Sequence, residues 1–146
     1  MIRPARPDEL GAVRELFREY GAFVGGPICF EKFAREIAAL PGEYFCVLVA
    51  EESGQLAGCA ALRKNAEGVA EMKRLYVRPA FQGRRLGRLL TERIIREATA
   101  AGYKLLRLDT LPVMESALAL YRSLGFREIP PYGGNPPEAI CFELPL

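Results

Sequence analysis

Apolar residues recur along this chain with two periods, one typical of helices and the other typical of strands. Between residues 10 and 20 they return every three or four positions, which predicts an amphipathic helix. The apolar face of that helix holds Leu10, Val13, Leu16, Phe17 and Tyr20. A short strand at residues 2–3 and the helix-opening pair Pro7-Asp8 come first, and we expect Asp8 to cap the helix.

Three further segments show the helical period. Residues 30–40 form one, which Pro41-Gly42 ends, and its apolar face consists of Phe30, Phe33, Ile37 and Leu40. Residues 85–101 form another, and its apolar stripe consists of Leu86, Leu89, Leu90, Ile94, Ile95 and Ala98. Residues 114–124 form the last one, which Gly125 is expected to end.

The other apolar segments are short and bounded by turn residues, as strands are. Residues 44–50 are almost continuously apolar, which suits a strand buried on both faces. Turn signals at Ser53-Gly54 and Glu67-Gly68 predict an antiparallel meander, whose third strand runs from about Val69 to Val77. Later strands are expected at residues 103–111, 126–129 and 139–146.

The third strand of the meander is followed by a helix and another strand. Two neighbouring strands that are joined in this way run parallel. Together with the antiparallel meander, this unit predicts a mixed sheet with helices on both faces, a fold of the α+β class. No repeat, low-complexity tract or linker interrupts the chain, so we predict one domain over residues 1–146.

Composition restricts the range of partners. The net charge of +2 is too small to imply a polyanionic partner by itself. The four cysteines lie far apart in apolar surroundings, and we interpret them as small buried side chains rather than disulfides or zinc ligands. There is no apolar signal region at the start, and no apolar run approaches the ~18 residues of a membrane span. We therefore expect a reduced, cytoplasmic setting without a membrane partner.

The chain contains no histidine. This excludes Ser-His-Asp and Cys-His nucleophilic machinery, H-E-x-x-H metal sites and any histidine general base. If the protein is an enzyme, then carboxylates, tyrosine, lysine or backbone dipoles must carry its proton and charge chemistry. No metal is predicted.

The stretch RPAFQGRRLGRLL, residues 78–90, joins a strand to a helix and contains two glycines and four arginines. A helix N-terminus has unpaired N–H groups and about half a positive charge, and glycine lets an anion approach those donors. The stretch has no G-K-[ST] and no G-x-G-x-x-G pattern. By itself it fits an anion site and a solvated basic turn equally well.

Two linked motifs decide between these alternatives. Gln82, Arg85 and Gly87 match Q/R-x-x-G-x-G/A after a strand, and one strand later residues 117–126 match A-x-x-x-Y-x-x-x-G-F. In this order the chain resembles the GNAT superfamily of acyl-CoA-dependent N-acyltransferases over nearly its whole length. The resemblance implies a mixed, mostly antiparallel sheet of six or seven strands, with a splayed central parallel pair and about four helices on both faces.

The resemblance also implies acetyl-CoA as the acetyl donor. The amides from Gly83 to Arg88 would hold its pyrophosphate, and the backbone of residues 75–77 would pair with its pantetheine and stabilise an oxyanion. The implied cofactor-binding residues are Leu75, Tyr76, Val77, Gln82, Gly83, Arg84, Arg85, Leu86, Gly87, Arg88, Ala117 and Tyr121. Arg85 replaces the family's usual first glycine, and we expect it to present its N–H from a helical conformation. Met114 replaces a frequent asparagine.

Tyr121 is the first catalytic candidate, because it occupies the tyrosine position of the second motif. Amine attack on acetyl-CoA expels a thiolate, whose conjugate acid has a pKa near 8.5, whereas the pKa of a phenol is about 10. A tyrosine can therefore donate a proton to that sulfur at neutral pH. For a tyrosine outside such a motif, a place in the core would be the ordinary interpretation.

Glu71 is the candidate general base, acting directly or through water, because an alkyl ammonium must lose a proton before it attacks. Strand alternation predicts that Glu71, Lys73, Leu75 and Val77 share one face, opposite to Met72, Arg74 and Tyr76. A solvated Glu71 paired with Lys73 or Arg74 is the equally favoured alternative.

Two loops and two pairs of charges complete the candidates. Tyr132, Asn135 and Gly25-Gly26-Pro27 lie where family members often shape the acceptor pocket, although plain surface loops are the favoured interpretation. Glu51-Glu52 and Arg63-Lys64 are interpreted as solvated turn charges.

The predicted function is transfer of an acetyl group to a primary amine of a small molecule or peptide. A domain that only binds or senses acyl-CoA is the alternative. Binding of nucleic acid is disfavoured, because the arginines form no clean stripe and no aromatic platform lies between them. A homodimer is common for such domains.

Overall fold

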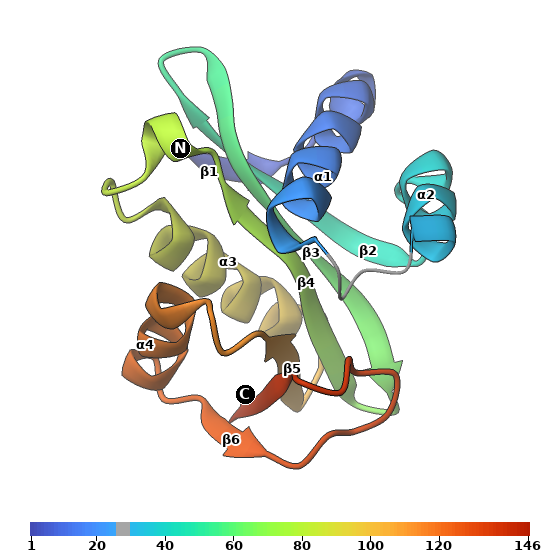
Figure 1. Ribbon diagram of the computed structural model, residues 1–146, viewed down its shortest axis with the longest axis vertical. Helices are drawn as coiled ribbons and strands as arrows, with labels where there is room; N and C mark the ends of the chain where they lie inside the picture. The colour runs from blue at the N-terminus through green and yellow to red at the C-terminus, as the bar shows by residue number, and fades with distance from the viewer. Residues whose placement is uncertain (26–29) are drawn as a thin grey trace.

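The computed structural model describes residues 1–25 and 30–146, and the side chain of Phe30 is not part of the description. Its centre is a seven-stranded sheet in the order β1-β2-β3-β4-β5-β7-β6 (Figure 1). The strands are β1 (Ile2–Pro4), β2 (Tyr44–Glu52), β3 (Gln55–Ala66), β4 (Val69–Val77), β5 (Leu105–Thr110), β6 (Arg127–Ile129) and β7 (Ile140–Pro145). Only β4 and β5 pair in parallel among these described strands.

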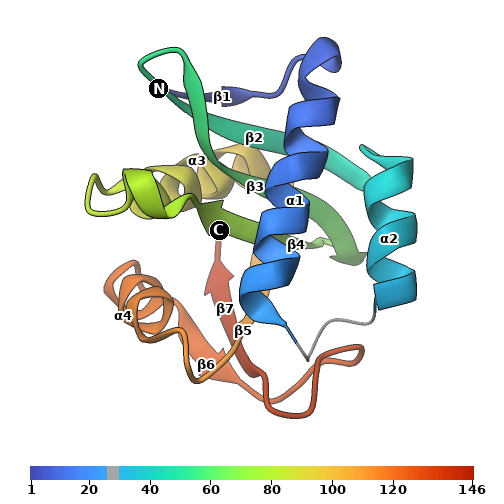
Figure 2. The ribbon, with the colours of Figure 1, turned by 45° about the horizontal axis from the view of Figure 1, so that its top comes forward.

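Helices cover both faces of the sheet (Figures 1 and 2). The four α-helices of the described residues are α1 (Leu10–Val24), α2 (Phe30–Ala39), α3 (Leu86–Ala100) and α4 (Glu115–Ser123), with short 3-10 turns at Pro7–Glu9 and Pro79–Phe81. The α+β class, the mixed sheet and its parallel pair are therefore confirmed. None of the helices in the described residues is long and apolar enough to cross a membrane.

Each face of the sheet has its own hydrophobic core. Under α1 and α2 lie Val13, Leu16, Phe17, Phe33 and Ile37, and under α3 lie Leu86, Leu90, Ile94 and Ala98, all of them buried. These positions confirm the helical stripes, except that Leu89 is 45% exposed. Cys59 and Cys141 are buried free thiols and Cys46 is partly buried, whereas Cys29 lies outside the described residues.

The first helix does not begin as predicted. Asp8 is exposed and its side chain caps nothing, because residues 7–9 form a 3-10 turn ahead of α1. Glu9 makes the local contact instead, since its Oε1 accepts the N–H of Arg6 at 2.8 Å. The same carboxylate also binds the guanidinium of Arg3 at 2.7 Å, which ties this turn to β1.

A bulge in β4 changes which side chains share a face. Arg74 has a φ of 61°, and the register moves from Ala61–Lys73 to Cys59–Tyr76, so two residues of β4 oppose Ala60. Beyond the bulge the alternation is inverted. Leu75 and Val77 pack on the α3 side together with Met72, and Tyr76 and Arg74 lie on the α1–α2 side. The prediction that Leu75 and Val77 share a face with Glu71 and Lys73 was therefore wrong.

The parallel pairing of β4 and β5 is short. It includes only the three pairs from Val69–Leu105 to Glu71–Arg107, although β4 continues to Val77 and β5 to Thr110. From Met72 onward, the edge of β4 that faces β5 has no strand partner in the described residues. The sheet therefore forks at Glu71, and the fork is the structural feature that positions the site.

Candidate active site

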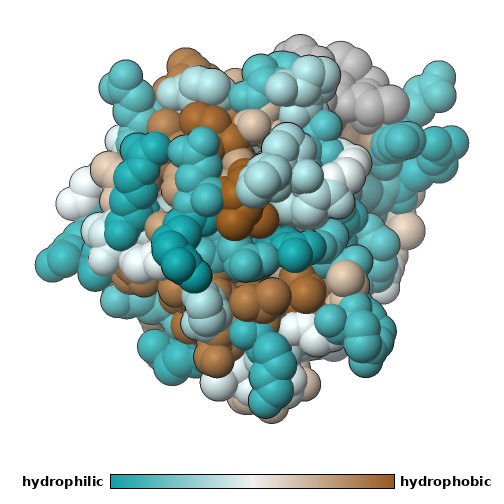
Figure 3. All heavy atoms as spheres, turned by 90° about the horizontal axis from the view of Figure 1, so that it is seen from below, coloured by the Kyte–Doolittle hydropathy of each residue, from teal (hydrophilic) through white to brown (hydrophobic). Residues whose placement is uncertain are grey.

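Two cavities meet at the fork. The larger one, of about 770 Å³, lies on the α1–α2 side and reaches across β4 to the loop that precedes β7. The smaller one, of about 50 Å³, lies between the diverging strands. Both are lined by Tyr20, Lys73, Arg74, Asp109, Thr110 and Met114. On the molecular surface seen from below, apolar and hydrophilic side chains are intermixed (Figure 3).

Tyr121 of α4 lines the smaller cavity and is only 4% exposed. Its ring packs against Phe126 and Phe142, at centroid distances of 5.7 and 5.9 Å. Burial, and to a lesser extent the nearby Tyr20 and Asp109, raises the pKa of Tyr121 well above that of a free phenol. The hydroxyl therefore keeps its proton at neutral pH. Ala117 lines the same cavity from one turn earlier in α4.

Leu75, Tyr76 and Val77 lie on the arm of β4 that has lost its partner strand. Leu75 lines the smaller cavity, and the Tyr76 hydroxyl donates to Glu19 at 3.2 Å. An unpaired strand edge offers N–H and C=O groups to any extended, amide-containing ligand. This arm is thus suited to pair with a chain such as pantetheine.

The turn before α3 presents free amides. Backbone hydrogen bonds flank the turn on both sides, from Gln82 N–H to Pro79 O and from Leu89 N–H to Arg85 O. Between them, the amides of residues 83–88 have no backbone acceptor in the described chain. Gly83 has a φ of 83°, and no atom lies within 4 Å of where a β-carbon would stand. The turn is therefore open, as an anion site at a helix N-terminus requires.

The side chains of this turn differ in their surroundings. Gln82 donates to Val77 O at 3.3 Å, Arg84 lies over the Phe81 ring, and Arg88 donates to Ser123 Oγ at 3.1 Å. Leu86 is buried in the core, so only its backbone can face a ligand. Two arginines near this turn in the sequence are in ion pairs: Arg78 binds Glu19, and Arg93 binds Glu97.

Arg85 does not have the helical conformation that we predicted. Its φ and ψ of 62° and 20° are left-handed, and it serves as the N-cap of α3. Glycine enters this region without strain, whereas a side chain costs about 1–2 kcal/mol there. The glycine that is usual at this position in the family would satisfy the same backbone.

We therefore expect Arg85→Gly to raise the free energy of unfolding by up to about 1 kcal/mol, because strain relief exceeds the added entropy loss of glycine. Urea unfolding measures the change. Arg84 is the matched control, because it is the same residue type without a positive φ. Arg84→Gly should lower stability, and equal effects of the two variants would contradict the explanation.

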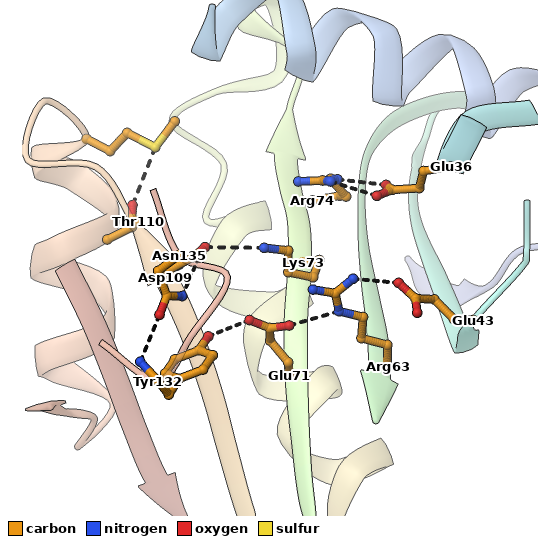
Figure 4. Close-up of polar contacts among 11 residues, drawn as sticks. Glu36, Glu43, Arg63, Glu71, Lys73, Arg74, Asp109, Thr110, Tyr132 and Asn135 are labelled. Atoms are coloured by element: carbon orange, nitrogen blue, oxygen red, sulfur yellow. Dashed lines mark hydrogen bonds and ion pairs between the residues drawn. The ribbon is translucent and has the colours of Figure 1, made fainter. Parts of the chain in front are cut away.

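Glu71 is the last residue of β4 that pairs with β5, and it is 2% exposed. Its Oε1 binds Arg63 Nε at 2.8 Å, and its Oε2 accepts a short hydrogen bond from the Tyr132 hydroxyl (Figure 4). Burial and the Glu71 carboxylate raise the pKa of Tyr132. Glu71 borders neither cavity in the described residues, and both of its oxygens are already in use.

Asp109 of β5 lies where the two cavities meet. Its Oδ2 accepts the side-chain amide of Asn135 at 2.8 Å, and its Oδ1 lies 3.4 Å from Lys73 Nζ (Figure 4). The loop before β7 is thus fastened to both central strands, to β4 through Tyr132 and to β5 through Asn135. Asn135 lines the larger cavity, which was one of the two interpretations of its loop in the sequence. Gly26 and Pro27 lie outside the described residues.

The opposite wall of the larger cavity contains a partly buried ion pair. The guanidinium of Arg74 makes bonds of 2.8 and 2.7 Å to Glu36 of α2, and it lies 4.9 Å from the centroid of the Phe33 ring. Burial acts to raise the pKa of Glu36, but the hydrogen bonds and the positive charge of Arg74 together with smaller contributions outweigh it and leave the pKa lowered. The Tyr44 hydroxyl is buried nearby and has no hydrogen-bond partner among the described residues.

Several residues of this site were missed or misread in the sequence. Arg63 is not a solvated turn charge, because it is partly buried between Glu71 and Glu43 and lines the larger cavity. Asp109 was overlooked, although an acidic residue at the end of an otherwise apolar strand was a usable signal. The pairing of Glu36 with Arg74 had no signal, because 38 residues separate the two. The described chain contains no group of three or more histidine, cysteine, aspartate or glutamate side chains that could hold a metal ion.

The forked parallel pair and the open amide turn at the head of α3 agree with the features that the resemblance to the GNAT superfamily implies. The profile of the acetyltransferase (GNAT) family matches residues 10–126, and the chain belongs to this family.

Relatives and a solved structure agree with this assignment. An uncharacterised N-acetyltransferase of Schizosaccharomyces pombe is 34% identical over 96% of this chain and 90% of its own. The IAA acetyltransferase of Azospirillum brasilense is 42% identical over 68% of this chain and 67% of its own. The yncA structure from Salmonella typhimurium, solved with its cofactor acetyl-CoA, has a TM-score of 0.73 and 25% identity, and the match covers 99% of this chain and 92% of that one. These names support acetyltransferase activity.

Proposed function

We propose that this protein transfers the acetyl group of acetyl-CoA to a primary amine, by direct attack within a ternary complex. The observation that carries the proposal is the position of Tyr121 in the small cavity at the fork, which joins the larger cavity through a shared lining. A donor could enter from the side of α3 and an acceptor from the side of α2. A domain that only binds acyl-CoA would not need the second cavity.

The residues present fit acetyl-CoA, which supplies an acetyl group already activated as a thioester. The open amides of residues 83–88 would bind the pyrophosphate, and the exposed side chains of Arg84 and Arg85 would add charge around it. The unpaired arm of β4, including Leu75 to Val77, would pair with the pantetheine and offer an amide to the developing oxyanion. Ala117 would lie beside the pantetheine of acetyl-CoA near the fork.

Tyr121 would protonate the departing sulfur. In the balanced step, the amine nitrogen bonds to the acetyl carbon, the carbon–sulfur bond breaks, and the sulfur receives the phenolic proton. The pKa of Tyr121 is raised by burial, so the residue enters the step protonated. The proton lost by the amine can then return to the phenolate through water.

Two carboxylates are candidates for taking the proton of the acceptor ammonium. The base role predicted for Glu71 stays a prediction, and the ion pair with Arg63 and the bond from Tyr132 support a second role, in which Glu71 positions the loop before β7. Asp109 borders both cavities. We therefore propose Asp109 as the carboxylate that faces the acceptor.

The proposal is tested with purified protein, acetyl-CoA and a panel of amino acids, small amines, polyamines, aminoglycosides and peptides. Release of coenzyme A thiol is followed, and the product is identified by mass. We expect acetylation of at least one amine class to exceed the rate without protein by at least about a hundredfold. Tight binding of acetyl-CoA without turnover in any class would instead identify a binding module.

Two further predictions from the sequence belong to this proposal. A cytoplasmic setting is supported by the buried free thiols of Cys59 and Cys141. One domain over residues 1–146 is supported by the continuous sheet, to which both terminal segments contribute strands.

A further inference from the structure

Lys73 and Asp109 form an ion pair at the place where the two cavities meet. The two side chains are only 13% and 14% exposed, and each comes from one arm of the fork. The distance of 3.4 Å between Nζ and Oδ1 is long for a charged hydrogen bond, which is typically 2.7–2.9 Å. The pair is therefore partly desolvated and only loosely closed.

The other ion pairs that line the larger cavity are closer. Arg74 and Glu36 bind each other through two bonds of 2.8 Å or less, and Arg63 binds Glu43 at 2.5 Å and Glu71 at 2.8 Å. Asp109 is the carboxylate of the described lining that borders both cavities, and its distance to Lys73 is the longest among the ion pairs of this lining.

From this geometry we propose that the acceptor is an α-amino acid with a free carboxylate, and this inference rests on the proposed function. The ammonium of the amino acid replaces Lys73 at Asp109, and its carboxylate binds the freed Lys73. The two charges of the ligand then match the two charges of the protein across the fork. One loose ion pair is exchanged for two pairs with the ligand.

A simple monoamine does not fit the same subsite. Its ammonium would bind Asp109 and leave the partly buried ammonium of Lys73 without a partner, which is costly. An α-carboxamide has nearly the shape of the amino acid but lacks the negative charge. The α2 side of the larger cavity also favours a negatively charged ligand, because Lys32 and Arg35 line it and have no ion-pair partner in the described residues.

The test compares amino acids with their own α-carboxamides. The probes are glycine, L-alanine, L-leucine, L-phenylalanine, L-aspartate and L-glutamate, each against its carboxamide, with kcat/KM corrected for the fraction of the ammonium form. We expect kcat/KM for the best acid to exceed kcat/KM for its carboxamide by at least about tenfold, which is the low end of the effect of one desolvated charge pair. In Lys73→Gln this ratio should fall to about threefold or less. Lys64→Gln is the matched control, because Lys64 is exposed and pairs with Glu67 away from both cavities.

A second measurement does not depend on turnover. Calorimetric titration of the coenzyme A complex should detect binding of the acid but at least about tenfold weaker binding of its carboxamide, and Lys73→Gln and Asp109→Asn should each abolish the difference. Equal or better use of the carboxamides, a ratio that Lys73→Gln leaves unchanged, or no binding of any of the acids would overturn the inference. Binding of the acid with this discrimination but without acetylation would support the subsite and contradict the proposed function instead.

Discussion

Replacing Tyr121 by phenylalanine should lower the rate of acetyl transfer at least about tenfold, with little change in coenzyme A affinity. The variant removes one hydroxyl and keeps the ring that packs against Phe126 and Phe142, so the core under α4 is preserved. The loss should appear in kcat, because the proton is needed as the sulfur departs. Steady-state kinetics and calorimetric titration with coenzyme A measure the two quantities.

Tyr103 provides the control for this experiment. It stacks on Phe45 at a centroid distance of 5.2 Å and lines neither cavity. Tyr103→Phe should therefore keep the wild-type rate. A wild-type rate in Tyr121→Phe would remove Tyr121 from the chemistry, and a parallel loss of rate and coenzyme A affinity would indicate a structural role only.

Arg74→Met should destabilise the protein by about 3 kcal/mol, because it leaves the carboxylate of Glu36 partly buried without its cation. The side chains of the pair are 13% and 16% exposed. Loss of the contact between the guanidinium and the ring of Phe33 adds to the effect. Denaturant unfolding at pH 7 measures the difference. Arg18→Met, which breaks an exposed pair with Glu15, should change stability by less than about 1 kcal/mol.

The deficit of Arg74→Met should also depend on pH. In the wild type the pKa of Glu36 lies below its usual 4.5, so the pair stabilises the fold above that pH and this contribution is lost as the pH falls through the lowered pKa. In the variant, burial is no longer outweighed by Arg74, so the pKa of Glu36 rises. In the variant, Glu36 is therefore protonated at a higher pH than in the wild type, and the stability deficit should shrink as the pH falls from 7 to about 4. A deficit that stays constant over this range would contradict the assignment to Glu36.

Local patterns predicted most of the fold. The strand at residues 69–77 has the bounds that turn residues and alternation indicated, and α3 differs from its prediction by one residue at each end. Such patterns are reliable because the period of buried side chains and the positions of glycine and proline are local properties. The start of α1 was predicted less well, because the sequence indicated Asp8 as the cap, whereas Glu9 makes the local contact with the Arg6 N–H and also binds Arg3 of β1.

The candidate site was only partly predictable. Two motifs indicated the open turn and Tyr121, because each motif lies within one short segment. The inverted faces of β4 were not visible, since a bulge adds no signal to the residues around Arg74 and yet moves every later side chain to the other face. Arg85 was read as helical for a related reason, because nothing in its own chemistry indicates a positive φ.

By itself, therefore, the sequence determined the order of strands and helices, the position of the open turn before α3 and the tyrosine of the second motif, since each of these depends on neighbours in the chain. The tertiary structure alone decided how charges are paired. It joined Glu71 to Arg63 and Tyr132, Arg74 to Glu36, and Lys73 to Asp109. The physical reason is that electrostatic pairing and burial depend on distance in space, and the end of the β4–β5 pairing at Glu71 sets those distances around the fork.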